Sequence, residues 1–170
     1  PDDNSFSLSA ETLNLEAVQF DGQSTPVTIR AADRFNNPAP DGTAVTFTTE
    51  GGSIPGSCTI SEGSCTVMFT TQDPYPADGR STILATAIGE ESFADTTPSN
   101  GRFDEGEFDL DNDLPEAFVD YNENGRRDSN EPYRDFNNDG SYTLGDNRFT
   151  GIRCEESESG TDETRDCATS

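Results

Sequence analysis

Apolar and polar residues alternate in short runs along the first 94 residues, and turn-forming residues separate the runs. Alternation with a period of two is typical of strands buried on one face. No stretch shows the 3.6-residue period of an amphipathic helix. Evenly spaced short strands predict an all-β fold, an antiparallel β-sandwich. The expected strands cover residues 6–10 with a continuation to 13–15, and residues 26–31, 43–49, 57–60, 65–70 and 81–87.

This part of the chain resembles bacterial immunoglobulin-like domains of the invasin/intimin class over about residues 5–90. The runs that carry the likeness are 26–38, which contains Asp33 and ends in Asn37-Pro38, then 42–49 with Val45 and Phe47, the paired glycines in 51–54, and 65–71. The resemblance implies an immunoglobulin-like sandwich, and a surface-exposed stalk or adhesin module rather than an enzyme.

The resemblance ends after the strand expected at 81–87. Members of the class then turn tightly into a final strand, whereas this chain runs into an acidic, loop-rich segment. Two alternatives remain open. Either the segment is inserted before a last strand beyond residue 148, with residues 149–153 as the candidate, or that strand is missing. A missing strand would leave an open sheet edge that can pair with another chain.

Residues 120–131 match the twelve-residue calcium loop, which supplies six to eight oxygen ligands by alternation along the chain. Gly125 stands at position 6, where the backbone conformation disfavours a Cβ atom. The match therefore predicts a calcium ion. The expected ligands are Asp120, Asn122, Asn124, the carbonyl of Arg126, Asp128 and Glu131.

The pattern recurs on both sides of this loop, so we expect two to three calcium ions. Residues 135–146 repeat it with Asp in place of Glu at the end, and residues 95–107 form a looser copy with one extra residue before Gly101. The expected ligands are Asp135, Asn137, Asp139, the carbonyl of Ser141, Thr143 and Asp146 in the first, and Asp95, Asn100, Asp104 and Glu107 in the second.

Three further acids, Asp109, Asp111 and Asp113, also alternate. They form another partial site, lend ligands to a neighbouring loop, or are solvated turn residues. Pro132 directly after Glu131 leaves little room for the helices of a paired EF-hand. The arrangement resembles the compact calcium-wrapped repeats of thrombospondin-like proteins, or a dockerin-type loop without its helices; in such segments metal replaces a hydrophobic core.

The charge of the chain favours cations as partners. It carries 34 Asp and Glu against 10 basic residues, a net charge of −24, and 21 of the acids lie in residues 95–170. Such a surface argues against nucleic acid and against anionic membranes. The chain has no histidine, which excludes Ser-His-Asp and Cys-His catalysis. We therefore expect no enzymatic activity.

Four cysteines allow three pairings, of which the local one, Cys58–Cys65 with Cys154–Cys167, is the simplest. A turn at Ser61-Glu62 would place Cys58 opposite Cys65 in a hairpin. Disulfides imply an oxidising compartment, and thus a secreted or cell-surface protein.

These observations predict three parts: a sandwich at 1–94, tandem calcium loops at 95–153 and a disulfide-closed acidic tail at 154–170. The first hypothesis is a non-enzymatic, calcium-stabilised module of a bacterial adhesin whose partners are neighbouring modules of a longer chain. The alternatives are a calcium-dependent module that binds a glycan or protein, and an accessory domain of a secreted hydrolase. Aromatic residues recur around the loops, either to pack them together or to stack on sugars.

Overall fold

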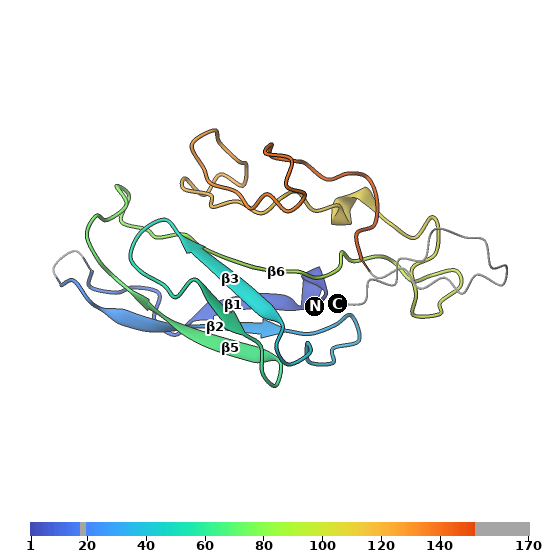
Figure 1. The fold of residues 1–170 in the computed structure, drawn as a ribbon, viewed down its shortest axis with the longest axis horizontal. Coiled ribbons are helices and arrows are strands. Elements are labelled where there is room, and N and C mark those ends of the chain that lie inside the picture. Colours follow the sequence, from blue (N-terminus) through green and yellow to red (C-terminus); the bar gives the residue numbers. More distant parts are fainter. Residues whose placement is uncertain (18–19, 152–170) are drawn as a thin grey trace.

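Two antiparallel three-stranded sheets make up the regular part of the computed structural model, which describes residues 1–17 and 20–151 (Figure 1). Within these residues there is no α-helix, and two short 3-10 helices, η1 (Asp3–Ser5) and η2 (Leu110–Asn112), are present. The prediction of an all-β fold with antiparallel sheets is confirmed. One sheet has the order β1 (Phe6–Ala10), β2 (Ser24–Ala31), β5 (Ser64–Thr70), and the other has the order β4 (Ser57–Thr59), β3 (Ala44–Thr49), β6 (Ile83–Ala87).

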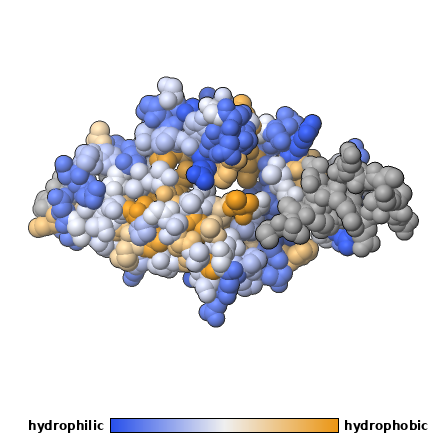
Figure 2. Space-filling model, in the orientation of Figure 1, coloured by the Kyte–Doolittle hydropathy of each residue, from blue (hydrophilic) through white to orange (hydrophobic). Residues whose placement is uncertain are grey.

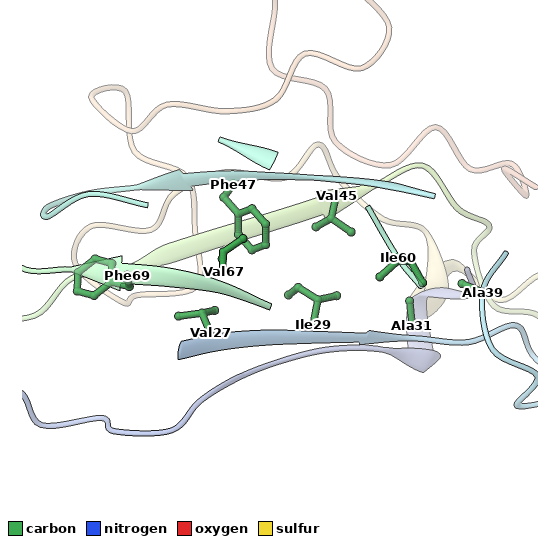
Figure 3. Packing of buried hydrophobic residues seen from close by; sticks show 9 residues of the cluster. All are labelled: Val27, Ile29, Ala31, Ala39, Val45, Phe47, Ile60, Val67 and Phe69. Atoms are coloured by element: carbon green, nitrogen blue, oxygen red, sulfur yellow. The ribbon is translucent and has the colours of Figure 1, made fainter. Parts of the chain in front are cut away.

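The core lies between the two sheets and follows from the alternation along the strands (Figure 3). In β2, Val27 and Ile29 are fully buried, and in β3 so is Val45, while their neighbours in sequence point outward. Burying one such side chain contributes about 1.5–3 kcal/mol. The buried cluster comprises Val27, Ile29, Ala31, Ala39, Val45, Phe47, Ile60, Val67 and Phe69.

The connection from β4 to β5 turns one residue later than expected. Two backbone hydrogen bonds join Ser61 and Ser64, so Glu62 and Gly63 occupy the turn. Both have positive φ, 51° and 76°, as a two-residue turn of type I′ requires. The predicted turn at Ser61-Glu62 is wrong because the glycine is needed inside the turn rather than after it.

The predicted disulfide between Cys58 and Cys65 is present, with a Cα–Cα distance of 6.3 Å. Its setting differs from the expected hairpin. β4 pairs with β3 and β5 pairs with β2, so the bridge ties the two sheets to each other. The predicted pair Cys154–Cys167 lies outside the described residues.

After β6 the chain forms loops, and no strand follows in the part that the structure describes. Residues 149–151 of the candidate final strand are not in a strand, and residues 152–153 lie outside the description. Figure 1 shows the later part of this loop segment, coloured yellow to red, running along the side of the molecule that carries β6, while the yellow-green part before it lies beyond the end of the sheets. The surface on that side is largely hydrophilic in Figure 2. No helix among the described residues is long and apolar enough to cross a membrane.

Candidate calcium-binding loops

Three loops contain the predicted ligands: loop A (residues 95–107), loop B (residues 120–131) and loop C (residues 135–146). Positions are numbered as in loops B and C, with the extra residue of loop A left out of the count. Each loop begins with an aspartate whose carboxylate accepts hydrogen bonds from the backbone N–H of the glycine at position 6 and of the residue before it. The contacts are Asp95 with Asn100 and Gly101, Asp120 with Asn124 and Gly125, and Asp135 with Asp139 and Gly140. These bonds, of 2.7–3.2 Å, fold each loop back onto its first residue.

The glycines have the backbone conformation that the motif predicts. Their φ angles are 76°, 74° and 77° for Gly101, Gly125 and Gly140, in the left-handed region where a Cβ atom is unfavourable. The residue after each glycine donates its N–H to the side chain at position 5, for example Arg126 to Asn124 at 2.7 Å. The three loops therefore share one local geometry.

A buried glutamate closes each loop. Its carboxylate accepts hydrogen bonds from the backbone N–H groups at positions 2 and 9. The closing contacts are Glu107 with Thr96 and Asp104 in loop A, Glu131 with Tyr121 and Asp128 in loop B, and Glu116 with Phe136 and Thr143 in loop C. Glu107, Glu131 and Glu116 are 6%, 2% and 7% exposed.

Loop C differs from the expectation in where its closing carboxylate comes from. Glu116 precedes the loop by 19 residues along the sequence. Asp146, which the motif assigns to this place, is exposed. Its carboxylate accepts a hydrogen bond from the N–H of Arg148 at 2.9 Å, and its own N–H donates to Asp113 at 3.0 Å.

The same pattern of hydrogen bonds occurs a fourth time, built from three separated segments. The contacts are Asp113 with Asp146 and Asn147, and Glu91 with Leu114 and Thr150. Asn147 takes the place of the glycine, with φ 61°. Gly145 lies so close to Asp113 that a Cβ atom there would stand 2.2 Å from the carboxylate carbon. Loops B and C are thus inserted within a fourth, discontinuous loop.

Asp109 and Asp111 have different surroundings from Asp113. Asp109 precedes η2 (Leu110–Asn112), and its side chain accepts a hydrogen bond from the N–H of Asp111 at 3.1 Å. Asp109 and Asp111 are both exposed, whereas Asp113 is half-buried.

A short repeat in the sequence contains three of the four closing glutamates, all except Glu107, and it is not part of the continuous twelve-residue motif. The repeat is Glu, any residue, an aromatic residue, any residue, Asp, and it occurs at 91–95, 116–120 and 131–135. In each copy the glutamate closes one loop and the aspartate opens another. Two copies, 116–120 and 131–135, run antiparallel, with a bridge between Phe118 and Tyr133.

Aromatic rings fill the space between loops B and C. Tyr142 packs edge-on against Phe118 and Tyr133, with centroid distances of 6.0 and 5.5 Å. The guanidinium of Arg127 lies over the rings of Tyr133 and Tyr142 at 4.5 and 4.9 Å. Such cation–π contacts contribute about 0.5–2 kcal/mol each. Side chains, in addition to hydrogen bonds, therefore hold the two loops together.

A second aromatic cluster contains residues of loop A and of the fourth, discontinuous loop. Phe103 stacks on the buried Phe149 with centroids 4.4 Å apart, and Phe93 packs edge-on against both. The guanidinium of Arg34 covers the ring of Phe93 at 4.2 Å. Phe136, by contrast, is 46% exposed.

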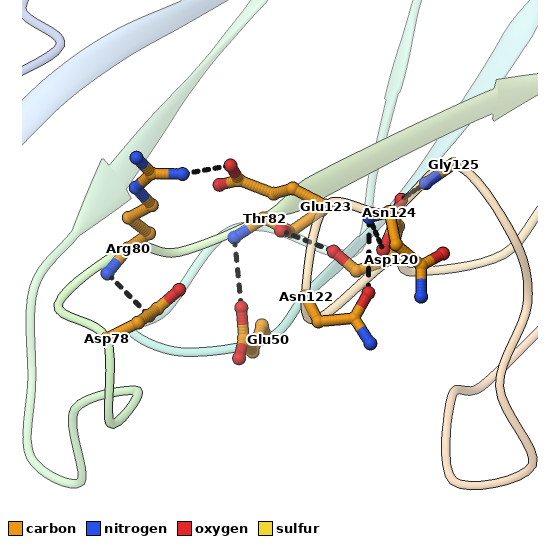
Figure 4. Close-up of polar contacts among 9 residues, drawn as sticks. All are labelled: Glu50, Asp78, Arg80, Thr82, Asp120, Asn122, Glu123, Asn124 and Gly125. Atoms are coloured by element: carbon orange, nitrogen blue, oxygen red, sulfur yellow. Dashed lines mark hydrogen bonds and ion pairs between the residues drawn. The ribbon is translucent and has the colours of Figure 1, made fainter.

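Loop B contacts the sandwich next to β6 (Figure 4). The hydroxyl of Thr82 donates a hydrogen bond to the backbone carbonyl of Asp120 at 2.9 Å. Arg80 forms an ion pair with Glu123. The first residue of loop B is therefore anchored to the strand region through its backbone.

Charge compensation within the loops comes from backbone N–H groups rather than arginine. In residues 1–17 and 20–151 the ion pairs are Arg34–Glu90 and Arg80–Glu123, so none involves a closing glutamate. Burial tends to raise the pKa of Glu107, but three backbone hydrogen bonds outweigh it and the pKa is lowered. Burial raises the pKa of Glu91, and the nearby carboxylates Asp113 and Asp146 add to that increase.

Loop B contains residue types whose oxygen atoms calcium takes as ligands. The described residues contain no group of three or more His, Cys, Asp or Glu side chains placed to bind a metal ion. Calcium, however, also takes amide and backbone carbonyl oxygens. The motif supplies such oxygens from Asn122, Asn124 and Arg126, together with the carboxylates of Asp120 and Glu131.

Comparison of the chain with protein-family models, curated proteins and solved structures gave no match. The fold and the loops define an all-β protein with an acidic, loop-rich extension.

Proposed function

We propose that the chain is a non-enzymatic, calcium-stabilised structural or adhesion module of a secreted or cell-surface bacterial protein. In this proposal the sandwich is immunoglobulin-like, of the invasin/intimin class. The loop segment, ordered by calcium, forms a rigid extension that holds neighbouring modules of a longer chain in a defined geometry.

One observation carries the proposal: three calcium-loop motifs in the sequence adopt the same local geometry, and each is closed by a buried glutamate whose carboxylate forms no ion pair with an arginine in the described residues. A buried carboxylate is costly unless hydrogen bonds or a cation compensate it. Backbone N–H groups supply such compensation here, and at Glu107 they outweigh the effect of burial. A bound cation would add to it and would reduce the repulsion among the acids of the segment.

The aromatic contacts favour a structural role over a sugar platform. The rings of Phe93, Phe103, Tyr133 and Tyr142 lie against other rings or against arginine. These rings are therefore engaged in contacts within the chain. A calcium-dependent glycan-binding or protein-binding module, or an accessory domain of a hydrolase, remains the alternative function, with the exposed Phe136 as its best-placed ring.

Calcium titration by calorimetry, together with thermal melting with and without chelator, tests the proposal. With free calcium at 100 times the dissociation constant, one site adds about 2.7 kcal/mol to the stability of the folded chain. Magnesium is the matched control, because it demands a smaller octahedral shell and dehydrates reluctantly. If no heat is observed and the melting curve is the same with calcium and with chelator, the proposal is wrong.

A further inference from the structure

We infer that Glu116, which lies outside loop C, supplies the carboxylate of position 12 to the calcium site of that loop, in place of Asp146. The inference rests on the proposed function, because it names a ligand of one of the proposed sites. It changes the site from a continuous loop to one that two segments complete together.

The carboxylate and the N–H of Glu116 make the same loop hydrogen bonds as those of Glu131 in loop B. Glu131 donates its N–H to the carbonyl of Asp128 at 3.1 Å and accepts from the N–H of Asp128 at 2.7 Å. Glu116 makes the same pair of bonds with Thr143, both at 3.0 Å. Asp128 and Thr143 both stand at position 9 of their loops.

The remaining contact of each glutamate agrees as well. Glu131 accepts from the N–H of Tyr121 at 2.8 Å, and Glu116 accepts from the N–H of Phe136 at 2.9 Å. Both donors occupy position 2. Glu116 is 7% exposed, whereas Asp146 is exposed and shorter by one methylene. The motif itself, found in the sequence, is independent of these contacts and predicts a calcium ion in loop C.

The arrangement couples loops B and C. The segment 116–120 closes loop C with its first residue and opens loop B with its last, and the segment 131–135 does the reverse. The backbone N–H of Val119 donates to Pro132 at 2.9 Å, and that of Arg134 donates to Ala117 at 2.7 Å. A calcium ion in loop C would therefore hold the segment from which loop B begins.

Two variants separate Glu116 from Asp146: Glu116→Gln and Asp146→Asn. Each removes one charge and keeps the size of the side chain. The readout is the backbone amide signals of Gly125 and Gly140, which occupy position 6 of loops B and C, followed by NMR during titration with calcium chloride. We expect Glu116→Gln to weaken the calcium response of Gly140 at least tenfold. Asp146→Asn should leave that response unchanged.

The outcomes distinguish the inference from the proposed function. If Asp146→Asn abolishes the response of Gly140, the inference is overturned and calcium binding stands. If Gly125 responds in the natural chain and Gly140 does not, the inference also fails while loop B keeps its ion. If neither glycine responds, both proposals fail. Should Glu116→Gln not fold, Asp146→Asn decides alone: a retained response of Gly140 supports the inference, and a lost response overturns it.

Discussion

Glu116 and Thr143 are joined by two hydrogen bonds, one in each direction, although 27 residues separate them in the sequence. Each residue contributes its backbone N–H, and the acceptors are the carbonyl of Thr143 and the carboxylate of Glu116. The pair closes loop C and also fixes the start of the segment that leads into loop B. Contacts of this kind make the loop segment one connected unit rather than a series of independent turns.

The substitution Gly145→Ala tests whether the fourth, discontinuous loop, which Asp113 opens, contributes to the stability of the fold. In Gly145→Ala the new Cβ would stand 2.2–2.4 Å from the carboxylate of Asp113. That carboxylate would have to move, and its hydrogen bonds to the N–H groups of Asp146 and Asn147, of 3.0 and 2.7 Å, would be lost. We expect a loss of about 2 kcal/mol in the free energy of unfolding, measured by urea denaturation.

Gly56→Ala is the matched control for this substitution. No atom lies within 4 Å of the Cβ position at Gly56, and its φ is not in the left-handed region. We expect its free energy of unfolding to change by less than about 0.5 kcal/mol. Equal effects of the two substitutions would show that the contact between Gly145 and Asp113 does not matter for stability.

Arg127 tests the packing between loops B and C. Arg127→Met keeps the aliphatic part of the side chain but removes the guanidinium from the rings of Tyr133 and Tyr142, and it removes the hydrogen bond from Nε to the carbonyl of Glu131 at 3.1 Å. We expect a loss of about 1–2 kcal/mol. The exposed neighbour Arg126 provides the control, and Arg126→Met should leave the urea midpoint unchanged. A similar loss in both variants would point to net charge as the cause.

The strands could be predicted closely because burial on one face imposes a period of two. The predicted strand at 26–31 corresponds to β2 at 24–31, and the one at 43–49 to β3 at 44–49. The turn between β4 and β5 was missed by one residue, since the pattern of apolar positions does not show which residues adopt positive φ.

The candidate site was predictable only where it is continuous in sequence. Loop B matches the motif from Asp120 to Glu131, and the structure shows its first and last carboxylates in equivalent roles to those of loop A. The roles of Glu116 and Glu91 depend on contacts with residues 27 and 59 positions away. A search for twelve-residue loops cannot detect such contacts.

We expect Asp33 to make the turn before Ala39 sensitive to acid. Its carboxylate accepts hydrogen bonds from the side-chain amide of Asn37 at 2.9 Å and from the backbone N–H groups of Phe35 and Asn37. The amide of Asn37 is the largest cause that lowers the pKa of Asp33 below its usual 3.8, against a smaller opposing effect of burial. A lowered pKa stabilises the fold above the unfolded-state value and loses that stabilisation as the pH falls through the folded-state value.

We therefore expect Asn37→Ala to raise the pKa of Asp33 and to reduce stability at pH 7 more than at pH 2. NMR titration of the side-chain carboxyl carbon of Asp33 measures the first effect, and urea denaturation at the two pH values measures the second. Asn14→Ala, at an exposed position outside the strands, is the control. Identical titration curves of Asp33 in the natural chain and in Asn37→Ala would contradict this account.

Thr82 and Arg80 both link loop B to the sandwich, but we expect their contacts to contribute differently to the local stability of the loop. In Thr82→Val the side chain keeps its shape but loses the hydrogen bond to the carbonyl of Asp120, which leaves a half-buried acceptor without this partner and costs about 1–2 kcal/mol. Arg80→Ala removes an ion pair whose side chains are 66% and 45% exposed, and such pairs contribute about 0–1 kcal/mol.

Hydrogen exchange of the Gly125 amide measures the local stability of loop B in each variant. We expect faster exchange in Thr82→Val than in Arg80→Ala. The reverse order would show that the charge of Arg80, and not the backbone contact of Thr82, holds loop B against the sandwich.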